Sequence, residues 1–154
     1  MTKNTKVVAA FPGCGKSWLF DHQADLNQTI LDSDSSGFSW SEPGVRNPEF
    51  PANYIKHIQE NIDKVDAILV STHQDVRNAL KAAGIEYTLV YPDVRCKDIY
   101  IQRYKDRGSP EAFIKLLEDK WGAWVEECRD ETYPTKISLG NRFIADVWDK
   151  ICSD

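Results

Sequence analysis

Short apolar runs alternate with amphipathic segments along most of the chain. Five runs rich in Val, Ile, Leu and Ala each stop at a Gly, Pro or polar turn signal: residues 6–10, 29–31, 67–71, 87–91 and 135–139. Such runs are typical of buried strands. Between them, apolar residues recur at helical spacing over residues 16–24, 51–64, 74–83, 95–107, 109–128 and 142–152. Strands separated by helices predict an α/β fold, with a five-stranded parallel sheet and helices on both faces.

Two segments interrupt this alternation. Residues 37–50 are rich in Gly, Pro, Ser and Asn, and a loop of this length is often functional. Gly108-Ser109-Pro110 breaks the helical pattern, with Ser109 as the expected N-cap of the next helix and Pro110 at its first position. We expect one domain over 1–154, with a lid or acceptor loop at about 37–50 and a short lid at about 103–110.

Composition narrows the function classes. The chain has 154 residues, of which 42% are hydrophobic and 28% are charged, as is typical of a globular domain. Its net charge is −5, whereas a protein that binds long nucleic acid requires a positively charged surface. It contains no run of about 18 apolar residues that would span a membrane. Its four cysteines include no C-x-x-C pair, so we expect free thiols and a cytoplasmic location.

The strongest motif follows the first predicted strand. Ala10 to Ser17 reads AFPGCGKS and fits the phosphate-binding loop (P-loop) pattern G-x-x-x-x-G-K-[ST], with Ala in place of the first Gly. Glycines let the backbone curl its N–H groups around an anion, the lysine reaches the β and γ phosphates, and the serine hydroxyl ligates Mg²⁺. The predicted ligands are ATP and Mg²⁺, the latter on Ser17. The expected nucleotide-binding residues are Phe11, Pro12, Gly13, Cys14, Gly15, Lys16, Ser17 and Trp18.

On these residues the chain resembles the P-loop nucleoside monophosphate kinases, and most of all the small nucleotide kinases encoded by bacteriophages. The likeness is carried by AAFPGCGKS (9–17), LDSDSSGFSW (31–40), NPEFPANYI (47–55) and EYTLVYP (86–92). The resemblance implies a single P-loop kinase domain that transfers the γ-phosphoryl group of ATP to a (deoxy)nucleoside monophosphate with Mg²⁺. For a phage-encoded protein it also implies the host cytoplasm.

Four arginines are candidates for binding phosphates. Arg103 and Arg107 are four apart, hence on one helix face, just before the Gly-Ser-Pro break. In the resembling kinases, arginines at such a break cover the transferred phosphate as a lid; the alternative is a solvated helix face. Arg46 and Arg77 are candidates for holding the acceptor phosphate with a bidentate guanidinium, whereas an exposed helical arginine is the alternative for Arg77.

Acidic residues follow the second predicted strand. Asp32 and Asp34 are placed at the carboxyl end of the sheet, where open α/β folds bind ligands. In a monophosphate kinase they would bind sugar hydroxyls or Mg²⁺ waters; in a kinase acting on a hydroxyl, Asp34 would be the general base. Turn formation is the ordinary alternative. The third strand ends in Ser71-Thr72-His73 without the carboxylate that often positions Mg²⁺, so either aspartate is a candidate for that role.

Three further residues are candidates for binding the acceptor. His73 is placed at the same edge of the sheet, although capping the next helix is an alternative. Phe38 and Trp40 could stack on a base or pack against the core. Trp121 and Trp124 belong to an apolar helix stripe that predicts core packing.

Three functions compete at this point. The first is a (deoxy)nucleoside monophosphate kinase with a small-molecule nucleotide acceptor. The second is a P-loop kinase for a hydroxyl on a polynucleotide end, a hydroxymethylated base or a small metabolite, where the acidic charge disfavours a long nucleic acid. The third is a nucleotide-hydrolysing switch, which lacks its usual carboxylate and base-specifying motif here. Whether the chain forms a homodimer stays open.

Overall fold

Five parallel strands form the central sheet of the computed structural model. The structure describes residues 4–33, 40–42 and 45–153; for residues 40–42 and 45–46 it describes the backbone alone. The strands are β1 (Lys6–Ala10), β2 (Ile30–Asp32), β5 (Ala67–Val70), β6 (Thr88–Tyr91) and β7 (Thr135–Ser138). Their spatial order is β2-β5-β1-β6-β7, so β1 lies in the centre, with Val8 paired to Leu69 of β5 and to Thr88 of β6. The predicted α/β fold with a five-stranded parallel sheet is confirmed.

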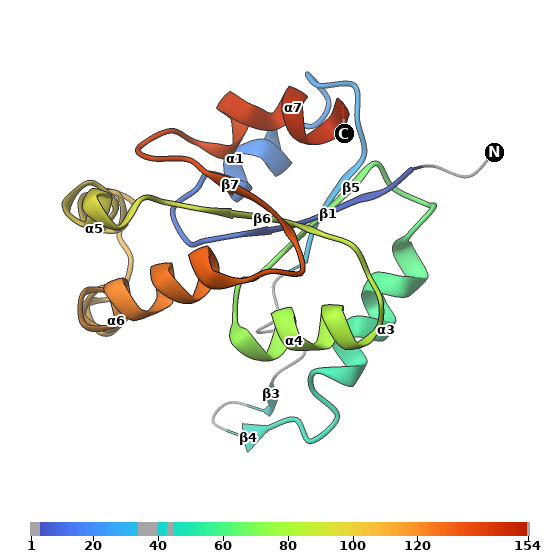
Figure 1. Cartoon of the computed structure of the whole chain (residues 1–154), viewed down its shortest axis with the longest axis horizontal. Coiled ribbons are helices and arrows are strands. Elements are labelled where there is room, and N and C mark those ends of the chain that lie inside the picture. The colour runs from blue at the N-terminus through green and yellow to red at the C-terminus, as the bar shows by residue number, and fades with distance from the viewer. Residues whose placement is uncertain (1–3, 34–39, 43–44, 154) are drawn as a thin grey trace.

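Helices cover both faces of the sheet, as predicted (Figure 1). They are α1 (Lys16–Asp21), α3 (Ala52–Asn61), α4 (Gln74–Ala82), α5 (Lys97–Asp106), α6 (Glu111–Asp130) and α7 (Trp148–Ser153), with 3₁₀ turns η1 (Val94–Cys96) and η2 (Ile144–Val147). In Figure 1, α1 and α7 lie on one face, whereas α3, α4 and α6 lie on the other. No helix within the described residues is long and apolar enough to cross a membrane.

Helix ends differ from the predicted ones for local reasons. The break before α6 is present, but Pro110 has an extended ψ of 145° and is therefore the N-cap, so the expected cap at Ser109 is wrong by one residue. The closing helix also begins later than position 142. Phe143 is extended, its N–H donates to Asp146 Oδ2 at 2.8 Å, and a 3₁₀ turn precedes α7. Backbone dihedrals at a cap decide such boundaries, and sequence patterns leave them uncertain by a residue or two.

The segment predicted as a long loop contains a short antiparallel pair. β3 (Trp40–Glu42) pairs with β4 (Val45–Arg46), and Trp40 is opposite Arg46. The sequence between the strands is Pro43-Gly44, a dipeptide typical of turns, which was the available signal for a hairpin. The pair was missed because its strands are too short to show an alternating hydrophobic pattern.

Trp121 connects the core to the end of β1. Its indole is 2% exposed, lies 5.4 Å from the Phe11 ring and 5.3 Å from the Tyr100 ring, and donates from Nε1 to the Val94 carbonyl at 2.8 Å. Truncating a buried tryptophan typically costs about 3–5 kcal/mol. The predicted apolar stripe of α6 is therefore core at Trp121, and it packs directly against the residue that opens the phosphate loop.

Candidate functional site: the phosphate loop and two adjoining cavities

The phosphate loop joins β1 to α1 in the place that the motif requires. Gly13 and Gly15 have φ values of +89° and +96°, a region that other residues rarely adopt. The loop is anchored at its start because Phe11 N–H donates to the Val90 carbonyl at 3.0 Å. Ala10, which replaces the usual first glycine, is a strand residue with no need for a positive φ. The motif thus lies in a strand–loop–helix context suited to phosphate binding.

Aromatic side chains pack against both loop glycines. A Cβ built on Gly13 would lie 2.9 Å from Tyr104 Cε1 and 3.0 Å from Tyr100 Cδ2, closer than real Cβ contacts. A Cβ on Gly15 would lie 3.2 Å from Phe143 Cδ1. Glycine is therefore favoured at both positions for two reasons: the backbone has a positive φ, and aromatic side chains occupy the space of a Cβ atom. The same contacts leave the loop little room to change shape.

Arg103 holds the loop from its outer side. Its Nη1 donates to the Gly13 carbonyl at 2.9 Å, and its Nη2 donates to the carbonyl of Asn141. The guanidinium carbon lies 4.4 Å from the centre of the Tyr100 ring and 3.9 Å from that of Phe143, so the cation is sandwiched between two aromatic faces. These contacts make Arg103 a positioning residue for the loop. Its predicted action on the transferred phosphate stays a prediction.

Arg107 is the more accessible of the two lid candidates. It is exposed, its Nε donates to Ser109 Oγ at 3.0 Å, and its guanidinium carbon lies 5.1 Å from the Tyr104 ring centre. Both arginines line one cavity of about 360 Å³ on the outer side of the loop, as expected for residues four apart. We call it the Phe143 cavity; its lining residues are Gly13, Gly15, Arg103, Asp106, Arg107 and Phe143.

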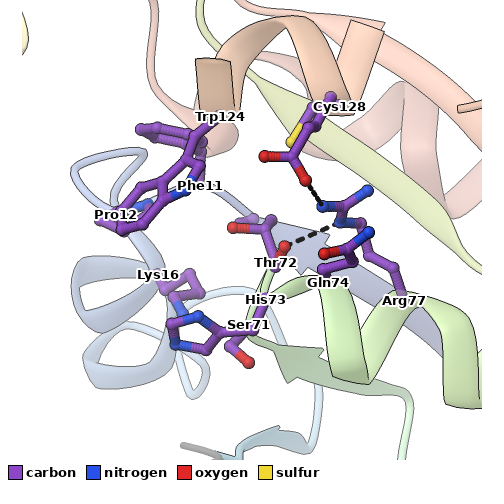
Figure 2. Close-up of a pocket in the computed structure, with 12 residues that line it drawn as sticks. Phe11, Pro12, Lys16, Ser71, Thr72, His73, Gln74, Arg77, Trp124 and Cys128 are labelled. Atoms are coloured by element: carbon purple, nitrogen blue, oxygen red, sulfur yellow. Dashed lines mark hydrogen bonds and ion pairs between the residues drawn. The ribbon is translucent and has the colours of Figure 1, made fainter. Parts of the chain in front are cut away.

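A second cavity opens on the other side of the loop. It has a volume of about 160 Å³ and is lined by Ala10, Phe11, Pro12, Lys16, Ser71, Thr72, His73, Gln74, Arg77, Trp124, Glu127 and Cys128. We call it the Arg77 pocket. Figure 2 shows Phe11, Pro12 and Trp124 forming one wall, with Gln74 and Arg77 lying across from them. The structure therefore brings together five of the predicted site residues: Phe11, Pro12 and Lys16 of the phosphate loop motif, and His73 and Arg77.

Arg77 is buried, so the alternative of an ordinary exposed helical arginine is wrong. It is 5% exposed and bridges three elements of the fold. Its Nε donates to the Thr72 carbonyl at 2.9 Å, its Nη2 lies 3.1 Å from Glu127 Oε1, and its Nη1 lies 3.4 Å from Glu131 Oε2. The carboxylates of Glu127, in α6, and Glu131, at the C-cap of α6, thus pair with one guanidinium from α4, which satisfies its charge within the protein.

His73 occupies the N-cap position of α4. Its carbonyl accepts a hydrogen bond from Arg77 N–H at 3.0 Å, but its imidazole makes no capping hydrogen bond. Its place along the chain agrees with the capping alternative, whereas its side chain lines the Arg77 pocket. Figure 2 shows the imidazole near Lys16 and Ser71, which line the same pocket, and its role in binding an acceptor stays a prediction.

The acidic segment after β2 is described only at its start. Asp32 ends β2 and is paired in register with Leu69, and the predicted Asp34 and Phe38 lie outside the described residues. For Trp40 and Arg46 the structure describes the backbone strands alone. Their roles in binding an acceptor stay predictions.

Ser33, which follows β2, is fixed on all sides. Its N–H donates to the Leu69 carbonyl at 2.9 Å, its Oγ lies 3.0 Å from His57 Nε2, and its carbonyl accepts from the Tyr54 hydroxyl. At 4% exposure the serine is one of two buried polar or charged residues within the described part of the chain. These bonds anchor the start of the acidic segment against α3.

Ser17 and Trp18 begin α1 and are both exposed. Trp18 stacks on His22 with ring centres 3.9 Å apart, so its ring points along the helix surface and its nucleotide-binding role stays a prediction. No group of three His, Cys, Asp or Glu within the described residues could hold a metal ion. A Mg²⁺ ion that arrives with ATP needs only one or two protein ligands beside phosphates and water, and the exposed Ser17 hydroxyl fits that requirement.

Cys14 lies inside the loop, but its thiol is buried and unreactive. It is fully buried, and burial raises its pKa to about 12 although the Tyr100 hydroxyl lies 3.7 Å from its sulfur. Burial also raises the pKa of Cys128, at the rim of the Arg77 pocket, to about 11. All four cysteines are free, as predicted. Neutral thiols at these two positions are poor nucleophiles, so they serve packing.

Several residues of the site carry no sequence signal. Glu127 and Glu131 look like ordinary exposed glutamates of an amphipathic helix, and Glu127 lies 50 positions after its partner Arg77. Phe143 is the N-cap of η2, near the end of the chain and far in sequence from the motif that it packs against. Only the fold brings these side chains to the loop.

Comparison with known proteins supports the assignment of the fold. No protein-family model and no curated protein matches the sequence. Fourteen chains of solved structures match. A tunicamycin resistance protein from Deinococcus radiodurans is 13% identical, with a TM-score of 0.63, over 98% of this chain and 94% of its own.

Two more of these structures are similar over nearly the whole chain. A gluconokinase from Sinorhizobium meliloti 1021 is 14% identical, with a TM-score of 0.57, over 99% of this chain and 90% of its own. An uncharacterized protein from Eubacterium ventriosum is 12% identical, with a TM-score of 0.51, over 98% of this chain and 97% of its own. The sheet order, the phosphate loop and these neighbours define the fold as that of the P-loop kinases.

Proposed function

We propose that the protein transfers the γ-phosphoryl group of ATP to a small acceptor bound in the Arg77 pocket. The observation that supports this most directly is the position of Lys16, which belongs to the phosphate loop and also lines the pocket. A lysine in the loop reaches the β and γ phosphates, so an acceptor in the pocket would face the phosphoryl group to be transferred.

Binding of ATP would use the loop backbone and the Phe143 cavity. The N–H groups around Gly13 and Gly15 would hold the phosphates, and Ser17 would hold the Mg²⁺ ion, which supplies positive charge to the β and γ oxygens. Arg107 has the exposure that a lid residue needs to approach the transferred group. We therefore retain residues 103–110 as the proposed lid, with Arg107 as its mobile cation.

Two acceptor classes compete for the pocket, a nucleoside monophosphate and a hydroxyl compound. The family resemblance favours the monophosphate. That acceptor carries about two negative charges and requires cations that are not already neutralised. Arg77, the buried cation of the pocket, is paired with Glu127 and Glu131. The hydroxyl acceptor is therefore the better supported choice. One structural neighbour is named a gluconokinase, which agrees with transfer to a hydroxyl; because gluconate is itself an anion, that name does not bear on the charge of the acceptor.

Transfer to a hydroxyl has defined chemical needs. The acceptor oxygen bonds to the γ-phosphorus while the bond to the β–γ bridging oxygen breaks, which releases ADP. The hydroxyl proton must pass to a base, and a positioned base typically contributes about 10²- to 10⁴-fold to the rate. Asp34 and Asp32, from the acidic segment after β2, are the proposed candidates for that base.

A panel assay tests the proposal. Purified protein is incubated with Mg-ATP and, separately, with the common (deoxy)nucleoside monophosphates, uncharged polyols and sugars, nucleosides, gluconate and 5′-hydroxyl DNA, and ADP formation and phosphorylated products are followed by chromatography. We expect a phosphorylated product from a hydroxyl compound. A nucleoside diphosphate as the sole product would restore the monophosphate kinase. Slow release of phosphate with no phosphorylated acceptor would instead support the nucleotide-hydrolysing switch.

A further inference from the structure

The lining of the Arg77 pocket contains one carboxylate among the described residues, Glu127. It comes from α6, whereas the other charged and polar lining side chains come from the phosphate loop motif, from the segment between β5 and α4, and from α4 itself. No sequence motif includes Glu127. A carboxylate beside the phosphoryl-transfer site would repel an anionic acceptor, so its presence requires an explanation.

Glu127 is held in one orientation by Arg77. Its Oε1 lies 3.1 Å from Arg77 Nη2, and no other hydrogen bond to this carboxylate is found among the described residues. The Arg77 side chain is 6% exposed, whereas the Glu127 side chain is 37% exposed. The arginine is therefore the buried support, and the glutamate is the member of the pair that a bound molecule can reach.

An ionised carboxylate accepts hydrogen bonds and donates none, so a bound molecule must offer it an O–H or N–H donor, and the acceptor in the proposed function carries a hydroxyl. We propose that Glu127, oriented by Arg77, accepts a hydrogen bond from an uncharged hydroxyl compound and excludes acceptors that carry a phosphate. This inference rests on the proposed function, because it places the acceptor in the Arg77 pocket. Glu131 also pairs with the guanidinium, so the two carboxylates outnumber the single cation of Arg77 and the group keeps a net negative charge.

The size of the pocket agrees with this choice. Its volume of about 160 Å³ is below the roughly 300 Å³ at which pockets for drug-sized ligands begin. It would admit a small polyol or the hydroxyl-bearing end of a larger molecule. Trp124 and Phe11 give the pocket an apolar wall suited to the C–H surface of such a compound.

Glu127→Gln tests the inference, with Glu126→Gln as the matched control. Glutamine keeps the size of the side chain and an oxygen that can accept from Arg77, but it removes the charge. Glu126 is the neighbouring residue of α6, is exposed and does not line the pocket. With the hydroxyl acceptor from the panel at saturating Mg-ATP, we expect Glu127→Gln to raise KM about ten- to hundredfold while kcat changes less. The control should match the wild type.

A second measurement reports on charge without turnover. Each protein is saturated with Mg-AMP-PNP, which fills the phosphate loop, and inorganic phosphate is titrated in by calorimetry. We expect Glu127→Gln to bind phosphate at least about tenfold more tightly than the wild type or Glu126→Gln. A mutation that only loosened the fold would weaken the binding of both ligands. Weaker binding of the hydroxyl compound together with tighter binding of phosphate would therefore identify a specificity-determining residue.

The proposed function and the role of Glu127 are contradicted by different results. If Mg-AMP-PNP does not bind, or no compound of the panel is phosphorylated, the proposed function is wrong. If Mg-AMP-PNP binds but Glu127→Gln gains no affinity for phosphate, the inference about Glu127 is wrong while the proposed function stands. Tight binding of phosphate to the wild type would also overturn the inference. Thermal unfolding of all three proteins, expected within a few degrees of one another, checks that the fold is retained.

Discussion

The two sides of the phosphate loop are built in different ways. On the outer side, the loop backbone is held by aromatic rings and by Arg103, whose guanidinium is bonded to two backbone carbonyls. On the inner side, the Arg77 pocket depends on charged side chains that join α4 to α6. Packing makes the first side rigid before any ligand arrives. Charge pairing gives the second side its selectivity, so changes to the two sides should affect different kinetic constants.

Lys16→Ala should have the largest effect, because Lys16 is the lysine of the phosphate loop motif and also lines the Arg77 pocket. Removing the cation that neutralises the β and γ oxygens should lower kcat by at least about 10³-fold, while circular dichroism and thermal unfolding remain those of the wild type. Steady-state kinetics on the best acceptor of the panel would measure it. Turnover within tenfold of the wild type in a well-folded variant would contradict the assignment of the phosphate loop.

Gly13→Ala should damage the outer side alone. The new Cβ would meet Tyr104 at 2.9 Å in a residue with φ of +89°, so the loop must change shape. Strain of this kind typically costs about 1–3 kcal/mol, and we expect Mg-ATP to bind about ten- to hundredfold more weakly by calorimetry. Gly84→Ala is the matched control, because Gly84 has φ of +70° and nothing within 4 Å of its Cβ. It should lose stability and keep its affinity for Mg-ATP.

Arg103→Ala and Arg107→Ala sharpen the comparison within the outer side. The contacts of Arg103 predict that its loss loosens the loop, which would weaken binding of Mg-ADP and Mg-ATP alike by about tenfold. Arg107 should instead lower kcat with less change in KM, because charge on the transferring group is greatest in the transition state. If Arg103→Ala lowers kcat and leaves the affinity for Mg-ADP unchanged, its role is in the chemical step, as the sequence pattern suggested.

The smallest effect concerns thiol chemistry. Burial raises the pKa of Cys14 from 9.0 to about 12, so its thiol is neutral at pH 8. Iodoacetamide should therefore modify the half-buried Cys96 and Cys152 before the buried Cys14 and Cys128, and mass spectrometry would show the order of modification.

The raised pKa of Cys14 also determines how the stability of the protein changes with pH. The folded state retains this proton while the unfolded chain loses it above about pH 9, so stability falls between pH 9 and 12. A Cys14→Ala variant should show a flatter decline.

The sequence was most informative where structure is local. The five apolar runs, the turn signals that end them and the glycines at positions 13 and 15 all depend on near neighbours along the chain, and the strands and the phosphate loop are found where they were predicted. The helix face shared by Arg103 and Arg107 is local in the same sense, and both residues line the Phe143 cavity.

The sequence was least informative where distant charges meet. Arg77 looked like an exposed helical arginine or a clamp for an acceptor phosphate, because nothing near position 77 reveals that Glu127 will be its partner. Neutralisation of a cation changes which ligand it can attract, so the acceptor class that we propose depends on a contact that the sequence does not reveal. The pairing of β3 with β4 was missed for a simpler reason, since two- and three-residue strands have no periodicity to detect.

The short connection between α5 and α6 has a thermodynamic consequence. Arg103 on α5 holds the loop that takes the nucleotide, Glu127 on α6 lines the acceptor pocket, and Trp121 packs between α6 and Tyr100 of α5. If binding at either site tilts this helix pair, the free energy of binding at the other site changes with it. Linkage requires the effect to be reciprocal: the factor by which bound nucleotide alters the dissociation constant of the acceptor equals the factor by which bound acceptor alters that of the nucleotide.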